Sequence, residues 1–575
     1  METIKVTIDG REVEVPSGAT ILEAAQKAGI EIPTLCYHPD LGTKAMCRIC
    51  VVEVEGARSL QTACSQPVSN GMVIKTTTPL VRETRKTNME LLLSNHPQDC
   101  LNCIRNQKCE LQSLSEKLGI RGQRFEQTEK FSHPKDMSSP SIVRDPSKCI
   151  LCRRCVAVCH QVQGVGAISP VNRGIETVVA PAGGNDLADV SCVYCGQCIQ
   201  VCPVGAIYEV DDTAKVWTAL ANPDLHVVVQ TAPAVRVAIG EELGMPAGSL
   251  VTGKMVAALR RLGFAQVFDT DFAADLTIME EGHELLDRLN NQGTLPMITS
   301  CSPGWIKYIE HNYPDYLDHL STCKSPQQMF GAMAKTYYAQ KSGIPAEKIF
   351  MVSVMPCTAK KFECERPEMQ ENGIQDVDVV LTTRELGRML RESGIDFKSL
   401  PDEDFDHPLG MSTGAAVIFG ATGGVMEAAL RTVYEVVTGK ELPKIDLEEV
   451  RGLEGVKEAV VDLDGTPVKV AVAHGLSNAK KLMDKIKNGT ADYQFIEVMC
   501  CPGGCIGGGG QPIPTNTETR KARLQAIYDE DKGMKIRKSH ENPAVQQLYQ
   551  EFLGKPLGEK SHHLLHTHYT KRKKH

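Results

Sequence analysis

The sequence predicts a multidomain protein in which small α+β modules precede one large α/β domain. Two observations favour this fold class. The chain has 22 cysteines; 15 of them lie before residue 203, and ten of those 15 are in groups spaced C-x2-C. From about residue 215 the sequence changes to apolar β-runs that alternate with helical segments. Because 575 residues are too many for one ordinary domain, we expect five segments: 1–80, 81–125, 138–210, 215–510 and 511–575.

Composition excludes some classes of protein. The formal net charge of −8 gives no reason to expect nucleic acid as the main partner. No uncharged apolar stretch reaches the roughly 18 residues of a membrane span, and residues 1–5 do not begin a secretory signal, so we expect a cytoplasmic protein. Because a cytosol keeps thiols reduced, the clustered cysteines indicate metal or redox use rather than disulfides.

Residues 1–80 are predicted to form a β-grasp ferredoxin-like module. Residues 4–8 alternate as a strand, Asp9-Gly10 is a hairpin turn, residues 12–15 resume the strand, and a helix from Ile21 stops at Gly29. A loop then carries C-x10-C-x2-C, and a fourth cysteine returns after 13 intervening residues, which suits a 2Fe–2S cluster. This spacing is longer than in plant ferredoxins and resembles complex-I-like proteins. The predicted ligands are Cys36, Cys47, Cys50 and Cys64.

Residues 81–125 are predicted to be a small helical domain around a second ligand group of the form H-x3-C-x2-C-x5-C. The group comprises His96, Cys100, Cys103 and Cys109. A structural zinc site of Cys3His type is admissible with these ligands. Their position between two cluster modules favours a 4Fe–4S cluster with one imidazole ligand. The polar residues 126–145 are expected to form a linker.

Residues 138–210 repeat the pattern C-x2-C-x2-C-x3-C, which is typical of bacterial two-cluster ferredoxins. In that pattern the fourth cysteine of each run binds the other cluster. One 4Fe–4S cluster is therefore predicted at Cys149, Cys152, Cys155 and Cys202, and the other at Cys159, Cys192, Cys195 and Cys198. Four clusters in series imply that electrons travel between the surface and a buried site in residues 215–575.

Three segments of the large domain place glycine or proline within two residues of a cysteine: 299–305, 355–363 and 497–512. They resemble the signature loops of [FeFe]-hydrogenases, T-S-C-C-P-x-W, M-P-C-x-x-K-x-x-E and E-x-M-x-C-x-x-G-C-x-x-G-G-G-Q-P. The N-terminal modules occur in the same order in the large clostridial-type members of that family. The resemblance covers essentially the whole chain and implies a hydrogenase catalytic domain over 215–510, followed by a C-terminal helical belt like the family's small subunit over 511–575.

The resemblance implies an H-cluster, which is a 4Fe–4S cubane joined by a cysteine sulfur to a diiron azadithiolate unit with CO and cyanide. Cys357, Cys501 and Cys505 would be cubane ligands, with Cys505 the bridge. Lys360 would donate to a cyanide. The remaining pocket residues would be Gln327, Pro233, Ala234, Met355 and Met499; alanine at 234, where the family often has serine, would remove one cyanide hydrogen bond.

The first loop departs from the family pattern. An ungapped alignment puts Cys301 at the proton-relay position and Ser302 at the position of the fourth cubane ligand. Either Ser302 coordinates through oxygen, or Cys301 coordinates and Ser302 helps the relay; thiolate preference favours Cys301. The resemblance also implies a proton route through Glu281, Glu284, Ser321 and Arg288, although helix carboxylates are more often merely solvated. Cys323, Cys364 and Cys500 receive no role and are expected to be buried thiols.

The expected function is therefore reversible H2 oxidation, with electrons relayed to ferredoxin or to flavin- and NAD(P)-binding partner subunits in a hetero-oligomer. Two alternatives remain. One is a non-catalytic iron–sulfur protein descended from hydrogenases, which the serine at 302 would suit, or a sensory hydrogenase, which would typically lose the relay thiol that Cys301 retains. The other is a complex I or formate dehydrogenase subunit, which shares the N-terminal half but lacks the three loops.

Overall fold

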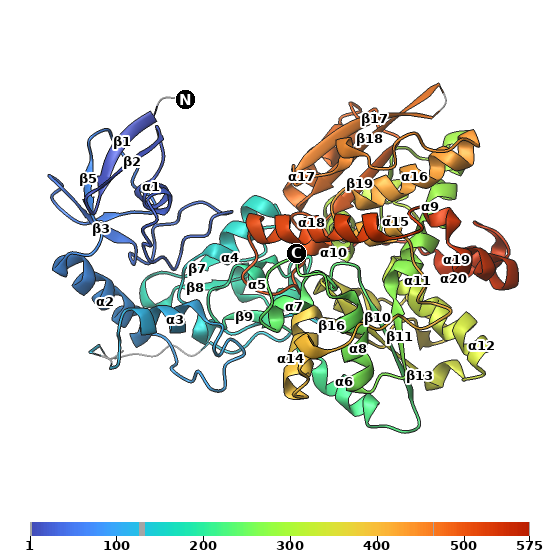
Figure 1. The fold of residues 1–575 in the computed structure, drawn as a ribbon, viewed down its shortest axis with the longest axis horizontal. Coiled ribbons are helices and arrows are strands. Elements are labelled where there is room, and N and C mark those ends of the chain that lie inside the picture. Colours follow the sequence, from blue (N-terminus) through green and yellow to red (C-terminus); the bar gives the residue numbers. More distant parts are fainter. Residues whose placement is uncertain (1–2, 123, 126–132, 464, 574–575) are drawn as a thin grey trace.

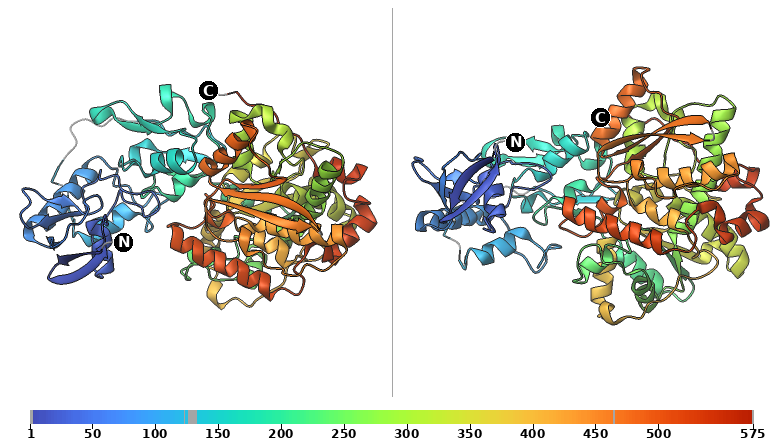
Figure 2. Two further views of the ribbon diagram at one scale, coloured as in Figure 1. Left: turned by 90° about the horizontal axis from the view of Figure 1, so that it is seen from above. Right: turned by 45° about the horizontal axis from the view of Figure 1, so that its top comes forward.

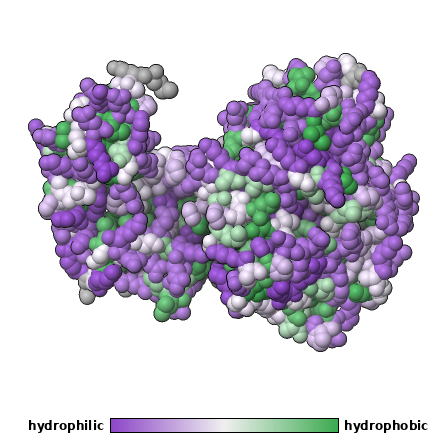
Figure 3. Space-filling view, viewed as in Figure 1, coloured by the Kyte–Doolittle hydropathy of each residue, from purple (hydrophilic) through white to green (hydrophobic). Residues whose placement is uncertain are grey.

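The computed structural model describes residues 3–122, 124–125, 133–463 and 465–573. The N-terminal modules, the two-cluster module and the large domain follow one another along the longest axis (Figure 1). Figure 2 gives the same order from two further directions. The face drawn in Figure 3 narrows between the N-terminal part and the large lobe, and its surface is mostly hydrophilic. The predicted multidomain α+β and α/β fold class is confirmed.

The first module is a five-stranded sheet with one helix. Its strands are β1 (Thr3–Ile8), β2 (Arg11–Pro16), β3 (Val51–Val54), β4 (Gln61–Thr62) and β5 (Val73–Lys75), in the order β2-β1-β5-β3-β4. The predicted hairpin forms, because β1 pairs with β2 antiparallel around the Asp9-Gly10 turn. Helix α1 (Ile21–Lys27) begins with a capping box between Thr20 and Glu23.

The next segment holds α2 (Pro79–Ser94) and α3 (Glu110–Lys117). The predicted linker over 126–145 lies partly outside the described residues, at 126–132, and is wrong for its second half. Asp136 there pairs through its backbone with Arg144, and its carboxylate accepts bonds from Ser138 and from the backbone N–H of Leu187. A buried aspartate satisfied in this way anchors the segment to the two-cluster module.

The two-cluster module shows its sequence repeat in its backbone. Helices α4 (Arg154–Ala157) and α5 (Gln197–Gln200) each follow a residue in the left-handed conformation, Arg153 with φ 60° and Gly196 with φ 69°. Strand β6 (Ile142–Arg144) pairs with β9 (Ile207–Glu209), and β7 (Ser169–Val171) pairs with β8 (Val178–Ala180). Equivalent turns therefore present both cysteine runs.

The large domain contains two four-stranded sheets, and their loops carry the motifs. In the first, β11 (Gln266–Asp269), β10 (His226–Thr231), β13 (Ile349–Met355) and β16 (Val379–Thr382) are all parallel. The second has the order β12 (Met297–Ile298), β19 (Phe495–Met499), β18 (Thr466–His474) and β17 (Val456–Leu463). The cysteine motifs follow β12, β13 and β19, and carboxyl ends of parallel strands are where α/β sheets place ligands.

Helices surround the two sheets. They include α8 (Thr252–Leu262), α9 (Thr270–Asn290), α10 (Pro303–Asn312), α11 (Pro326–Met333), α13 (Ala359–Cys364), α14 (Thr383–Glu392), α16 (Gly424–Thr438) and α17 (Leu476–Lys487). Helix α9 packs on both α11 and α16 and is buried over most of its length. A long helix between two layers can carry acidic side chains into the interior, provided that partners satisfy them.

The last residues form α18 (Thr517–Gly533), α19 (Pro543–Leu548) and α20 (Glu559–Leu565). Helix α18 crosses the front of the large lobe in Figure 1. Arg523 of this helix is buried and pairs with Glu241 at 2.7 Å. No helix among the described residues has the length and apolar character to cross a bilayer.

Candidate active site and cluster-binding residues

The three cysteine-bearing loops meet at one buried cavity of about 80 Å³. Residues from the loops after β10, β12, β13 and β19 line it, so its wall is assembled from segments more than 200 residues apart in the chain. The lining includes the predicted residues Pro233, Cys301, Ser302, Gln327, Met355, Cys357, Lys360, Met499, Cys501 and Cys505. Ala234 is fully buried behind this wall, where its carbonyl accepts a hydrogen bond from Gln511.

The cavity suits thiolate ligands for a metal cluster. Burial, and then the neighbouring thiols, raises the pKa of Cys357, and burial together with Cys501 raises the pKa of Cys505 to about 12. Such thiols ionise in the interior only if a cation binds them. Glycines let the third loop approach, since a Cβ at Gly508 would lie 2.2 Å from the Pro356 carbonyl oxygen. The donor set and its crowding therefore fit an iron–sulfur group.

A buried carboxylate fixes the polar wall of the cavity. Glu363 accepts hydrogen bonds from Lys360 at 2.8 Å, from Ser325 at 2.8 Å and from Gln327 at 3.2 Å. Lys360 also donates to the backbone carbonyl of Cys301 at 3.2 Å. The sequence places Glu363 in the second motif, but only the structure gives it this positioning role.

The predicted proton-route residues form a continuous polar chain. The Ser321 hydroxyl donates to Glu284 at 2.9 Å, and Arg288 pairs with Glu284 at 2.6 Å. Burial, and then the charge of Glu284, raises the pKa of Glu281 to about 8, which a hydrogen bond with Ser321 partly offsets. Burial and then Glu281 raise the pKa of Cys301, so this thiol faces the start of the chain.

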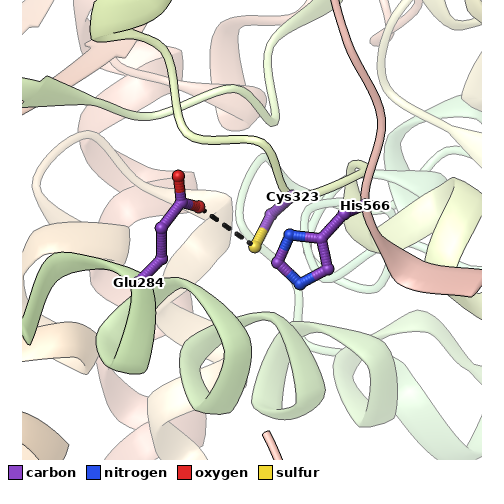
Figure 4. Close-up of side chains that lie close together, drawn as sticks. All are labelled: Glu284, Cys323 and His566. Atoms are coloured by element: carbon purple, nitrogen blue, oxygen red, sulfur yellow. Dashed lines mark hydrogen bonds between the residues drawn. The ribbon is translucent and has the colours of Figure 1, made fainter. Parts of the chain in front are cut away.

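The C-terminal segment continues this polar chain. Figure 4 shows Glu284 of α9, Cys323 and His566 converging, with Cys323 donating to Glu284 at 3.9 Å. His566 bonds to Thr322 at 2.8 Å through Nδ1 and to Glu280 at 3.1 Å through Nε2. Because both imidazole nitrogens are occupied, these groups act as a hydrogen-bonded network rather than an open set of metal ligands. No sequence pattern indicated His566 or Glu280.

The two-cluster module contains two further cavities with four cysteines each. One is lined by Cys149, Cys152, Cys155 and Cys202, and the other by Cys159, Cys192, Cys195 and Cys198. These are the two crossed sets expected from the repeat, in which the last cysteine of each run serves the other site. Eight thiols divided four and four around two buried spaces fit two 4Fe–4S clusters.

The two ligand groups predicted in the N-terminal modules also lie close together. In the second group, three of the four predicted ligands line one hollow. Cys36 accepts hydrogen bonds from the backbone N–H groups of Met46 and Cys47, and Cys64 accepts one from Thr43 at 3.2 Å. The hydrogen bond with Cys47 lowers the pKa of Cys36 to about 6, and the one with Cys50 does the same for Cys64. Thiols held this close, in two pairs, suit a cluster.

His96, Cys100 and Cys109 line one hollow. The Nδ1 atom of His96 is buried without a hydrogen-bond partner among the described residues, as a metal ligand would be before the metal binds. Gly205 lies against Cys103, where a Cβ would come within 2.6 Å of its sulfur. Ligand type still admits zinc or iron–sulfur at this site.

Three glutamines attach the two-cluster module to the third catalytic loop. Gln163 donates to the Cys500 carbonyl at 3.1 Å, Gln197 to the Gly507 carbonyl at 2.9 Å, and Gln200 to the Gly508 carbonyl at 2.7 Å. Cys195 lines the catalytic cavity as well as its own cavity. The adjoining cluster site is therefore in direct contact with the catalytic site, which spacing alone did not reveal.

The chain belongs to the iron-only hydrogenase family. Residues 225–509 match the family model described as the iron only hydrogenase large subunit, C-terminal domain, and residues 517–572 match the iron hydrogenase small subunit. The N-terminal part matches a 2Fe-2S iron-sulfur cluster binding domain at 1–79, the NADH-ubiquinone oxidoreductase-G iron-sulfur binding region at 85–124 and a 4Fe-4S dicluster domain at 142–206. The resemblance to [FeFe]-hydrogenases is confirmed.

Its relatives include proteins that it matches over their whole length. It is 56% identical to the NADP-reducing hydrogenase subunit HndD of Solidesulfovibrio fructosivorans over 100% of both chains, and 42% identical to iron hydrogenase 1 of Clostridium pasteurianum over 98% of this chain and 100% of that one. A solved [FeFe]-hydrogenase HydA1 from Chlamydomonas reinhardtii matches 63% of this chain and 99% of its own, with 45% identity and a TM-score of 0.57. The chain is thus an [FeFe]-hydrogenase with N-terminal iron–sulfur domains.

Proposed function

We propose that the protein interconverts H2 with protons and electrons at an H-cluster held in the cavity between the two sheets. The observation that carries the proposal is the convergence of three signature loops on one buried cavity lined by Cys357, Cys501 and Cys505. When bound, the H-cluster would supply the heterolytic cleavage and formation of H2. Cys505 would bridge its cubane to its diiron azadithiolate unit.

The remaining lining residues would orient this group. Lys360 would donate a charge-assisted hydrogen bond to a cyanide, and Glu363 holds its ammonium in place at 2.8 Å. Gln327 and Pro233 line the same cavity, and Met355 and Met499 supply soft, apolar surface. The fourth cubane position has three candidate ligands in the wall, namely Cys301, Ser302 and Cys500.

Protons would move between Cys301 and the surface along the buried polar chain. Glu281 lies within hydrogen-bonding reach of Ser321, and the Ser321 hydroxyl donates to Glu284 at 2.9 Å. Because the pKa of Glu281 is raised to about 8 by burial and then by Glu284, this carboxyl can gain and lose a proton near neutral pH, as a relay requires. Arg288 stabilises the charge that Glu284 carries at the outer end.

Electrons would move through one 2Fe–2S and three 4Fe–4S clusters, held in a row from the cavity toward the N-terminus. Cys195 belongs to the nearest of these sites and also lines the catalytic cavity. The N-terminal modules match those of an NADH-ubiquinone oxidoreductase subunit, and HndD is named as a subunit of an NADP-reducing hydrogenase. We therefore propose a hetero-oligomer with flavin- and NAD(P)-binding subunits, with ferredoxin as a further electron carrier.

The test is reduction of the N-terminal clusters by H2. In the matured protein, H2 should produce the electron paramagnetic resonance signal of the reduced 2Fe–2S cluster. The variant Cys159→Ser removes a ligand of the same cluster site that does not line the catalytic cavity, so it should slow this reduction while leaving H/D exchange at the cavity intact. If H2 never reduces any cluster although dithionite does, the protein is a sensory or non-catalytic relative. Chains that co-purify with the native protein would identify its partners.

A further inference from the structure

The catalytic cavity contains a cysteine that the signature motifs do not use. Cys500 occupies an unspecified position of the third motif, directly after β19, and its side chain lines the cavity together with Cys357, Cys501 and Cys505. At the same time Ser302 occupies the position where the family's first loop has its second cysteine. One thiol is missing from the first loop and one additional thiol is present in the third.

These two exceptional residues are in direct contact. The backbone N–H of Cys500 donates to the Ser302 hydroxyl oxygen at 3.2 Å. The sulfur of Cys500 lies against Gly304, two residues beyond Ser302, because a Cβ on that glycine would come within 2.7 Å of it. The Cys500 sulfur therefore lies beside the first loop, at the part of the wall where the replaced cysteine would stand.

The catalytic cavity and the neighbouring cavity of the second ferredoxin cluster differ in the number of cysteines that can serve as cluster ligands. The cavity of the second ferredoxin cluster already has Cys159, Cys192, Cys195 and Cys198, which is a complete set for a cubane. The catalytic cavity has only three cysteines that match ligand positions of the motifs. Cys500 is close enough to hydrogen-bond with both Cys195 and Cys501. It can therefore supply the fourth thiol that the catalytic cavity lacks.

Cys301 is less suited to the same role. Its thiol lies next to Glu281, at the inner end of the polar chain that includes Ser321 and Glu284. A thiol bound to iron there would no longer exchange a proton with Glu281. Ser302 offers only a hydroxyl, and iron in sulfide clusters prefers the softer thiolate.

We propose that Cys500 is the fourth ligand of the catalytic cubane and that it compensates for the serine at 302, leaving Cys301 free to relay protons. On binding, the Cys500 thiol releases its proton to water and its sulfur donates a lone pair to iron, with no change in oxidation state. Ser302 keeps a structural role, accepting the hydrogen bond that holds the Cys500 backbone. This inference rests on the proposed cubane at Cys357, Cys501 and Cys505.

The test uses the full chain produced without its diiron unit and then supplied with a synthetic diiron azadithiolate complex carrying CO and cyanide. Infrared bands of CO and cyanide report only the catalytic site, because the other clusters carry neither ligand. In Cys500→Ala the intensity of the bound-complex bands should fall by about tenfold or more, since a site without its ligand loses its metal group. Cys500→Ser should retain bands at shifted positions.

Three further variants separate ligand loss from misfolding. The double variant Ser302→Cys/Cys500→Ala restores a thiol at the family's usual position and should recover the bands. Gly304→Ala should perturb them in the parent, because the added methyl displaces the Cys500 sulfur, but not in the double variant. Cys364→Ala, which removes a buried thiol that donates to the Lys361 carbonyl, is the matched control and should behave as the parent.

Cys500→Ala with bands of parental position and intensity would overturn the inference, as would a double variant that fails to recover them while folding normally. Failure of the proposed function is distinguishable. In that case the parent itself would show no bands, or Cys357→Ala and Cys505→Ala would leave them unchanged.

Discussion

The two-cluster module and the catalytic cavity both depend on buried thiols, but they assemble them differently. In the module, eight ligands lie within 54 residues, from Cys149 to Cys202, and a repeated turn presents each run. In the cavity, the cysteines of the three signature loops follow three strands that belong to two different sheets. Local spacing specifies the first kind of site, whereas the second kind exists only once the sheets have packed. A substituted ligand is therefore easily detected in the module and easily overlooked in the cavity.

The largest expected effect comes from removing a cavity thiol. Cys505→Ala should abolish H2 production and uptake, because this cysteine would join both halves of the H-cluster. Iron bound by the N-terminal modules should remain, since their cysteines lie elsewhere. Gas chromatography of H2 together with iron analysis would check this. Retained activity would show that the cavity is not the site of reaction.

Next in size is the inner carboxyl of the proton route. Glu281→Gln keeps the shape and a hydrogen bond to Ser321 but cannot exchange a proton, so turnover should fall by about 10²–10⁴-fold. The infrared bands of the bound cluster should stay at their parental positions. Glu241→Gln, at a carboxylate that pairs with Arg523 outside the route, is the matched comparison. Parental turnover in Glu281→Gln would remove this residue from the route.

The same carboxyl predicts a pH dependence. The pKa of Glu281 is raised to about 8, chiefly by burial, so the group is protonated below that pH and ionised above it. The rate of H2 production should therefore decline above about pH 8, approaching a tenfold loss for each further unit. Steady-state rates from pH 6 to 10 would measure it, and the residual rate of Glu281→Gln should lack this inflection.

The smallest expected effect concerns the interface between the two regions. Glu209 at the end of β9 pairs with Arg384 at 2.7 Å and with Arg388 at 2.8 Å, and its side chain is 2% exposed. Glu209→Ala leaves two arginines without this partner and should cost about 3–5 kcal/mol in the free energy of opening the interface. Hydrogen exchange of β9 and α14 would report it. Lys480→Ala, at an exposed pair with Asp484, should change local opening by no more than about 1 kcal/mol.

Features that depend on local sequence pattern could be predicted, in both regions of the molecule. The β1–β2 hairpin, the crossed cysteine sets and the positions of β10, β13 and β18 follow from local pattern. Contacts made across the chain do not. Three features depend on partners 36 to 337 residues away. They are the hydrogen bonds by which Glu363 organises the cavity wall, the glutamines that attach the two regions, and the bond between His566 and Glu280. The prediction of a linker over 126–145 was wrong for the same reason. The carboxylate of Asp136 accepts a hydrogen bond from Leu187, which lies 51 residues away, and no local pattern indicates that contact.

The central claim is that H2 reacts in the cavity between the two sheets, and the exchange of D2 with protons of water tests it without any partner or electron acceptor. With the diiron unit inserted, the protein should produce HD and H2 from D2 in ordinary water, and Cys505→Ala should produce none. If the infrared bands of the bound diiron unit are present and no HD forms, the protein does not catalyse the reaction proposed for it.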